Sequence, residues 1–142
     1  MTTDIPCTLE IRLERVIGAA PAEVFDAWLD PKVPGTTWHA ADKLMLDPRP
    51  DGMFFWRMNT TGTPHYGRFT RVERGSALEH TWVSPNTLGR ESRVSVSFAS
   101  CTEGTRMVLT HSGLPDNEQG RRHEQGWNYF LGLFRGPAEE PS

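Results

Sequence analysis

Apolar and polar residues alternate over the first predicted element, a strand at Leu9–Ile17. Leu9, Ile11 and Leu13 share one face and charged residues occupy the other, which is typical of a half-buried strand. A short helix is predicted next, over Pro21–Leu29, because proline suits the first helical position. The apolar stripe of this helix, which we expect to lie in the core, consists of Val24, Phe25 and Trp28.

The middle of the chain consists of short apolar segments separated by turn sequences, among them DPRPDG at residues 47–52. Proline, aspartate and glycine favour turns because of their backbone geometry and local hydrogen bonding. Short strands joined by such turns indicate an antiparallel meander. The six strands predicted here are Lys43–Leu46, Met53–Met58, His65–Glu73, Leu78–Val83, Glu91–Ser100 and Thr105–His111.

The apolar period becomes helical after residue 115, which predicts one long amphipathic helix over Asp116–Arg135. Asp116 is predicted to cap this helix, with Gln119 three residues later as in a capping box. His123 lies one turn before Trp127 and shares its helix face. The apolar face of the helix, which we expect to pack on the sheet, consists of Trp127, Phe130, Leu131 and Phe134.

The order strand, helix, six strands, helix predicts an α+β fold. In this fold a bent antiparallel sheet of six to seven strands surrounds a long C-terminal helix. The chain has 142 residues and no internal repeat, so we expect a single domain over residues 1–142. A sheet bent around a helix often leaves an internal space, which makes a ligand cavity a natural hypothesis.

Composition and charge exclude several classes of protein. There are 15 Lys and Arg residues against 18 Asp and Glu residues, a formal net charge of -3, so we expect no nucleic-acid partner. No apolar run approaches the roughly 18 residues of a membrane span, and the first ten residues lack a secretory signal, so we expect a cytoplasmic protein without membrane insertion. Cys7 and Cys101 have no metal-site spacing, and we expect two buried free thiols, no metal and no cofactor.

Several stretches of the chain carry a family resemblance. They are residues 15–19 leading to 21–28 (RVIGA, PAEVFDAW), 67–69 (GRF), 80–82 (HTW), 104–114 (GTRMVLTHSGL) and 123–127 (HEQGW). In this order they resemble the bacterial homologues of the C-terminal domain of the heat-shock protein 90 ATPase activator. These homologues belong to the SRPBCC superfamily, also called START-like or Bet v-like proteins. The resemblance covers nearly the whole chain and implies a helix-grip fold.

The chain departs from the family pattern at two places. Pro34-Gly35 interrupts the region where such proteins usually carry a second short helix with paired tryptophans, and only Trp38 remains there. His80 stands where family members commonly have an aromatic or aliphatic residue. We therefore expect different access to the cavity and a more polar cavity wall.

Strand alternation places the candidate site residues on inward faces. We interpret Trp28 as core, and Trp56, Trp82 and Trp127 as better candidates for a cavity wall, because small-molecule pockets combine aromatic walls with a few polar groups. Gly126 either lets the final helix approach the sheet or widens the mouth of the cavity. The residues predicted to line the cavity are Trp38, Phe54, Trp56, Met58, Phe69, His80, Trp82, Met107, Leu109, His111, His123, Trp127, Phe130 and Leu131.

Three of these residues are histidines, His80, His111 and His123, and they allow two chemical alternatives. Converging imidazoles can bind a metal ion, and one imidazole near neutral pKa can act as a general base. Neither alternative has the spacing of a metal motif or a legible nucleophile beside it. We therefore expect histidines of the core or the cavity wall, with a catalytic role unassigned.

The favoured function is binding of a small, largely apolar ligand, a lipid, a polyketide or an aromatic metabolite, between the sheet and the C-terminal helix. The first alternative is an enzyme of hydrolase, cyclase or dehydratase type that uses the cavity histidines. The second is contact with a chaperone ATPase, which only the family's namesake suggests. A homodimer is a further partner hypothesis.

Overall fold

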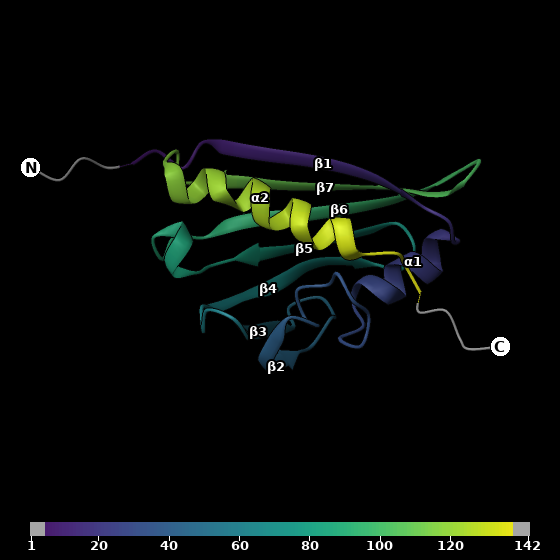
Figure 1. Cartoon of the computed structure of the whole chain (residues 1–142), viewed down its shortest axis with the longest axis horizontal. Coiled ribbons are helices and arrows are strands. Elements are labelled where there is room, and N and C mark those ends of the chain that lie inside the picture. Colours follow the sequence, from purple (N-terminus) through teal and green to yellow (C-terminus); the bar gives the residue numbers. More distant parts are fainter. Residues whose placement is uncertain (1–4, 138–142) are drawn as a thin grey trace, which may run out of the picture.

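The computed structural model describes residues 5–137 as one seven-stranded antiparallel sheet with two α-helices (Figure 1). The sheet order is β1-β7-β6-β5-β4-β3-β2, so each strand from β2 to β7 lies beside its neighbour in the sequence. The elements are β1 (Leu9–Ile17), α1 (Pro21–Trp28), β2 (Ala41–Leu46), β3 (Met53–Met58), β4 (Pro64–Glu73), β5 (Ala77–Trp82), the 3-10 helix η1 (Pro85–Thr87), β6 (Ser92–Cys101), β7 (Gly104–Leu114) and α2 (Glu118–Leu133).

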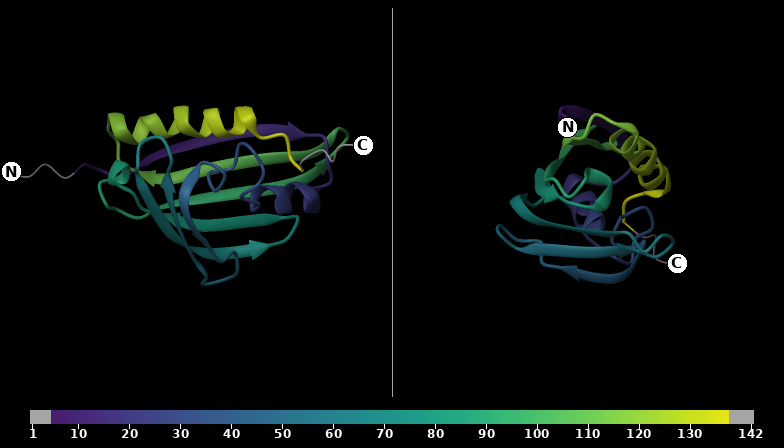
Figure 2. Two further views of the ribbon diagram at one scale, coloured as in Figure 1. Left: turned by 60° about the horizontal axis from the view of Figure 1, so that its bottom comes forward. Right: turned by 90° about the vertical axis from the view of Figure 1, so that its left-hand side faces the viewer.

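Helix α2 lies along one side of the curved sheet, and Figure 2 shows the sheet bending around to face it. Register shifts between Phe69 and Arg71 in β4, and at the starts of β1 and β2, provide local irregularities that bend strands. The predicted helix-grip architecture, with a bent antiparallel sheet and a long C-terminal helix, is confirmed.

The strand boundaries agree closely with the predicted ones, but the start of α2 differs. Asn117, not Asp116, is the N-cap residue, and its side chain accepts a hydrogen bond of 2.8 Å from the backbone N–H of Gly120. Asp116 instead forms an ion pair of 3.1 Å with Arg121. The helix therefore begins at Glu118, two residues later than predicted, and the predicted capping box with Gln119 is wrong.

The segment between α1 and β2 contains turns and no second helix, as Pro34-Gly35 suggested. The indole of Trp38 nevertheless enters the core and donates a hydrogen bond of 3.0 Å to the carbonyl of Trp28. Gly35 adopts a φ of +92°, and a Cβ there would collide with the backbone of Phe134. This close approach lets the segment pack against the end of α2.

The core is aromatic and densely packed. Phe54, Phe69, Leu109 and Phe134 are all at most 1% exposed. Phe25 of α1 packs edge-to-face on Phe98 of β6, with 5.3 Å between ring centroids. Much of the internal space that we expected between the bent sheet and the C-terminal helix is therefore filled by side chains.

The two cysteines differ from the prediction in their burial. Cys7 and Cys101 are both free, as predicted, but both are partly exposed. Cys7 precedes β1, and Cys101 ends β6 at a turn, so neither position is covered by the sheet and α2. Neither described helix is long and apolar enough to cross a membrane.

Gly67 in β4 is predicted to be irreplaceable by any residue with a side chain. A Cβ there would collide with the carbonyl oxygen of Thr81 and lie 2.7 Å from the ring of Phe54. Gly67→Ala should therefore lower the free energy of unfolding by about 3 kcal/mol in urea denaturation. Gly132→Ala is the control, since a Cβ there meets no atom, and it should raise stability by about 0.5–1 kcal/mol. Equal stability of the two variants would contradict the described packing of β4.

Candidate functional site

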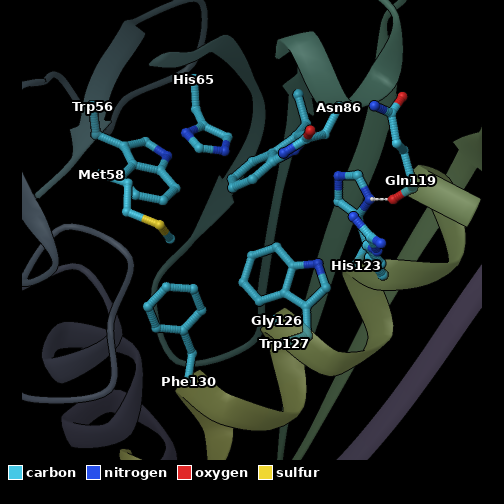
Figure 3. Close-up of a pocket in the computed structure, with 11 residues that line it drawn as sticks. Trp56, Met58, His65, Asn86, Gln119, His123, Gly126, Trp127 and Phe130 are labelled. Atoms are coloured by element: carbon cyan, nitrogen blue, oxygen red, sulfur yellow. Dashed lines mark hydrogen bonds between the residues drawn. The ribbon is translucent and has the colours of Figure 1, made fainter. Parts of the chain in front are cut away.

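A pocket of about 120 Å³ lies between the N-terminal half of α2 and the inner faces of β3, β4 and β5 (Figure 3). Helix η1 contributes Asn86 to its edge. Aromatic rings from the strands and from α2 form most of its wall. The lining residues are Trp56, Met58, His65, Trp82, Asn86, Gln119, Arg122, His123, Gly126, Trp127 and Phe130.

The structure brings six of the predicted cavity residues to this pocket: Trp56, Met58, Trp82, His123, Trp127 and Phe130. Eight others lie elsewhere, buried in or beside the core: Trp38, Phe54, Phe69, His80, Met107, Leu109, His111 and Leu131. The six pocket residues and the eight core residues lie on the same side of the sheet. The pocket is confined to one end because the aromatic core occupies the rest of that space.

A larger depression of about 760 Å³ lies on the surface between the start of α1 and the end of α2. Its lining includes Val33, Leu133 and Pro137 but no aromatic residue. It also lacks a buried polar atom without a partner, among the described residues. The smaller aromatic pocket is therefore the better candidate site, despite its volume.

A chain of buried hydrogen bonds joins α2 to the sheet beside the pocket. The indole N–H of Trp127 donates to Nδ1 of His111 at 2.9 Å. Because Nδ1 accepts this bond, the proton of the neutral imidazole is on Nε2, which lies 2.7 Å from Oγ of Ser92. The Ser92 hydroxyl in turn donates to the carbonyl of Trp82 at 3.0 Å. Both nitrogens of His111 are thus engaged in holding the fold.

His80 is also a core residue. It packs edge-to-face on Phe54 and Phe69, with centroid separations of 4.9 and 5.4 Å, and its Nδ1 bonds the carbonyl of Thr81 at 2.9 Å. Burial lowers the pKa of His80 to about 4. The expectation that His80 makes the cavity wall more polar is wrong, because strand β5 directs it into the aromatic core and not into the pocket.

His111 has a pKa well below its ordinary value, first because of burial and then because of the nearby imidazoles of His123 and His80. Both nitrogens of His111 are engaged in hydrogen bonds, so neither has a free lone pair to accept a proton or to bind a metal ion. Within residues 5–137, no three His, Cys, Asp or Glu side chains are arranged to hold a metal ion. The three-histidine metal alternative therefore lacks its ligands.

His123 is the histidine of α2 at the pocket wall. Its Nδ1 donates to the backbone carbonyl of Gln119 at 3.0 Å, one turn earlier in the helix (Figure 3). This bond places the proton on Nδ1 and leaves Nε2 with a lone pair. Burial lowers the pKa of His123, and the carbonyls of Gln119 and Gly120 offset part of that decrease.

His65 also lines the pocket, although it is not among the residues predicted from the sequence. Its ring stacks on Trp56, with centroids 4.0 Å apart and planes 6° from parallel. Burial and then the charge of His123 lower its pKa to about 4, although backbone groups of Thr63 and Trp56 act in the opposite direction. Its Nδ1 is buried without a hydrogen-bond partner of normal geometry. The available signal was alternation, since His65 precedes Gly67 and Phe69 on the inner face of β4.

Two indole N–H groups of the pocket wall also lack partners. They belong to Trp56 and Trp82, whose side chains are almost entirely buried. Arg122 is the only charged residue among those that line the pocket, and it is paired with Glu118 at 2.8 Å on the exposed side of α2. The interior of the pocket is thus aromatic, its one charged lining residue is at the rim, and two unpartnered N–H donors are buried in its wall.

Gly126 lines the pocket on α2, where a Cβ would meet no atom within 4 Å. Of the two predicted roles for this glycine, the structure favours the wider pocket mouth, because no strand approaches the helix there. The neighbours Asn86, Gln119 and Arg122 complete the rim, and no sequence motif marked them.

A bent antiparallel sheet closed by a C-terminal helix, with an aromatic pocket between the two, defines the helix-grip class of proteins. The chain belongs to the family described as Activator of Hsp90 ATPase homolog 1-like protein, whose sequence profile matches residues 18–136. The family resemblance in the sequence is therefore confirmed. No curated protein sequence matches the chain significantly.

Solved structures share the fold at low sequence identity. Protein CV1439 from Chromobacterium violaceum has a TM-score of 0.72 and 22% identity, over 87% of this chain and 92% of that one. Protein MLL2253 from Mesorhizobium loti has a TM-score of 0.70 and 20% identity, over 88% and 93% of the two chains. DynU16, from the dynemicin biosynthetic locus, has a TM-score of 0.72 and 18% identity, over 87% of this chain and 45% of its own.

Acid should destabilise the protein through its buried histidines. His80 has a pKa of about 4 in the folded chain, below the ordinary value near 6.5 that it regains on unfolding. The unfolded state therefore takes up the proton first, and stability is complete above about pH 6.5 and is lost as the pH falls toward 4. His80 alone should remove about 2 kcal/mol from the free energy of unfolding between pH 7 and pH 5.

Urea denaturation at a series of pH values measures this loss. His80→Phe should make the pH dependence shallower, because phenylalanine suits the aromatic surroundings and does not titrate. His39→Asn, which removes an exposed histidine, is the matched control with which the slope of His80→Phe is compared. A slope that is the same in His80→Phe and in the unmodified protein would contradict the neutral, buried state of His80.

Proposed function

We propose that this protein binds a small, largely apolar compound, with one ring of that compound seated in the pocket between α2 and strands β3 to β5. The observation that carries the proposal is the pocket itself, whose wall combines Trp56, Trp82, Trp127 and Phe130 with a few polar groups. Such a combination is typical of sites for small molecules, in which apolar area supplies affinity and polar atoms supply orientation.

The volume of the pocket limits the ligand. An engineered protein cavity of about 150 Å³ holds one benzene molecule, and this pocket has about 120 Å³. One aromatic ring or a similar group is therefore its natural occupant. A lipid chain or a fused-ring polyketide exceeds this space. Among the predicted ligand classes an aromatic metabolite is therefore favoured. Any part of the ligand larger than one ring would lie outside the pocket mouth beside Gly126.

Two aromatic side chains of the pocket wall are held in place by contacts within the protein, as expected for a preformed binding site. Trp127 is fixed by its hydrogen bond to His111, and Trp56 by its stack on His65. Side chains that are already held in place lose little conformational entropy when a ligand binds. The pocket is therefore suited to bind a ring with little rearrangement of its aromatic wall.

The enzymatic alternative now rests on one residue. Among the three histidines first considered, only His123 both lines the pocket and has a nitrogen free of hydrogen bonds. No described residue beside it forms a nucleophile pair with it. Binding is therefore the function we propose, while general-base catalysis by His123, contact with a chaperone, a homodimer and a cytoplasmic location remain predictions from the sequence.

Filling the pocket from α2 tests the proposal. Gly126→Leu places a side chain in the open space at the pocket, and Gly132→Leu places the same side chain on the same helix away from it. Both changes should stabilise α2 slightly, because leucine is the better helix former. Toluene binding, measured by calorimetry and by NMR chemical shifts, should weaken at least tenfold in Gly126→Leu and stay unchanged in Gly132→Leu.

Two results would contradict the proposal. One is the absence of toluene binding to the unmodified protein at any soluble concentration. The other is an equal loss of binding in both leucine variants, which would place the site elsewhere on the molecule.

A further inference from the structure

We infer that the ligand of this pocket carries a neutral acceptor oxygen, of the kind found in an aryl ketone, and that the indole N–H groups of Trp56 and Trp82 bind this oxygen. The inference rests on the proposed function and specifies the chemistry of its ligand. It concerns two donors that the fold itself leaves unused.

The unpartnered state of these indoles is specific to the pocket. Trp56 is 1% exposed and Trp82 is 4% exposed, yet neither Nε1 atom has a hydrogen-bond partner. Trp38 and Trp127 are equally buried, and their indoles donate to the carbonyl of Trp28 and to His111. A buried donor without a partner costs about 1–3 kcal/mol, so two such donors in one wall require a reason.

The two indoles lie together around His65. Their ring centroids are 5.8 Å apart, and the imidazole of His65 lies 4.0 Å from Trp56 and 4.9 Å from Trp82. In Figure 3 the nitrogen-bearing edge of the Trp56 indole faces His65 and the interior of the pocket. Both indole nitrogens are buried, so these rings must move apart slightly before one oxygen placed among them can accept from both.

The two unpartnered indole nitrogens of the wall can only donate, and this determines the polarity of the ligand group that they can bind. Trp56 and Trp82 can only donate, whereas the lone pair of His123 is on the α2 side. The complementary ligand atom is an oxygen with lone pairs. An alkyl or unsubstituted aromatic ligand would leave both indoles unsatisfied.

The charge of the wall favours a neutral oxygen over a carboxylate. Among the described residues that line the pocket, the single charged one, Arg122, is at the exposed rim and paired with Glu118. Moving a carboxylate out of water without a paired cation costs several kcal/mol, more than two neutral hydrogen bonds return. A carbonyl oxygen can use the same donors at a much smaller cost of desolvation.

Two probes of equal shape test the inference. Acetophenone and α-methylstyrene differ only in the replacement of the carbonyl oxygen by a CH₂ group. Because the two probes also differ in hydration, the readout is the change in each dissociation constant caused by a variant, measured by calorimetry. Trp56→Phe and Trp82→Phe keep an aromatic ring and remove the N–H donor.

Each variant should weaken acetophenone binding at least fivefold and change α-methylstyrene binding less than twofold, as the loss of one hydrogen bond predicts. Trp38→Phe is the matched control, since Trp38 is buried outside the pocket, and it should leave the ratio of the two constants unchanged. Benzoate should bind more weakly than acetophenone. Tighter binding of benzoate would overturn the assignment of a neutral oxygen.

A spectroscopic measurement keeps the test valid even where a variant fails to fold. In the unmodified protein, acetophenone should move two of the five indole N–H resonances downfield, as a new hydrogen bond does, and α-methylstyrene should not. Binding of both probes with equal losses in the variants, or with no downfield shift, would overturn the inference and leave the binding function intact. Binding of neither probe, nor of toluene, would instead contradict the proposed function.

Discussion

The hydrogen bond from Trp127 to His111 is the contact on which the arrangement of helix and sheet depends. It joins the apolar face of α2 to β7, and Ser92 extends it through β6 to the carbonyl of Trp82 on β5. Apolar packing alone is nondirectional, so it holds α2 against the sheet without fixing the position of the helix along it. A buried, directional chain through three strands fixes that position.

The pocket is a consequence of the same arrangement. With Trp127 fixed toward His111, the adjoining turns of α2 place His123, Gly126 and Phe130 opposite β3 and β5. The absent side chain at Gly126 leaves the mouth of the pocket open. The aromatic core fills the space toward α1 and ends at Trp56 and Trp82. These two indoles therefore face the core with their rings while their N–H groups find no acceptor in the protein.

Much of the fold could be predicted from the sequence, because local patterns determine it. The alternation of apolar and polar residues predicted the strands. The spacing of Trp127, Phe130 and Leu131 predicted the buried face of α2. The helix start was missed by two residues, because Asp116 and Asn117 are both capping residue types and only the backbone geometry selects Asn117. The burial of the cysteines was also misjudged, since Cys7 and Cys101 lie outside periodic segments.

The site was predicted less completely, for a physical reason. Alternation identifies side chains that face inward, but it cannot distinguish one that borders an empty space from one that fills it. Phe54 and Trp56 are both inward residues of β3, and only Trp56 reaches the pocket. His65 was missed because its role comes from stacking on Trp56 across the β3–β4 pair, a contact that depends on strand register.

A crystal structure with 4'-bromoacetophenone tests the central claim most directly, because the anomalous signal of bromine locates the ligand without bias. We expect one bromine peak near the pocket mouth beside Gly126, with the carbonyl oxygen about 2.7–3.2 Å from the indole nitrogen of Trp56 or Trp82. A bromine peak confined to the surface depression near Val33 and Leu133, or an aromatic pocket that stays empty, would contradict it.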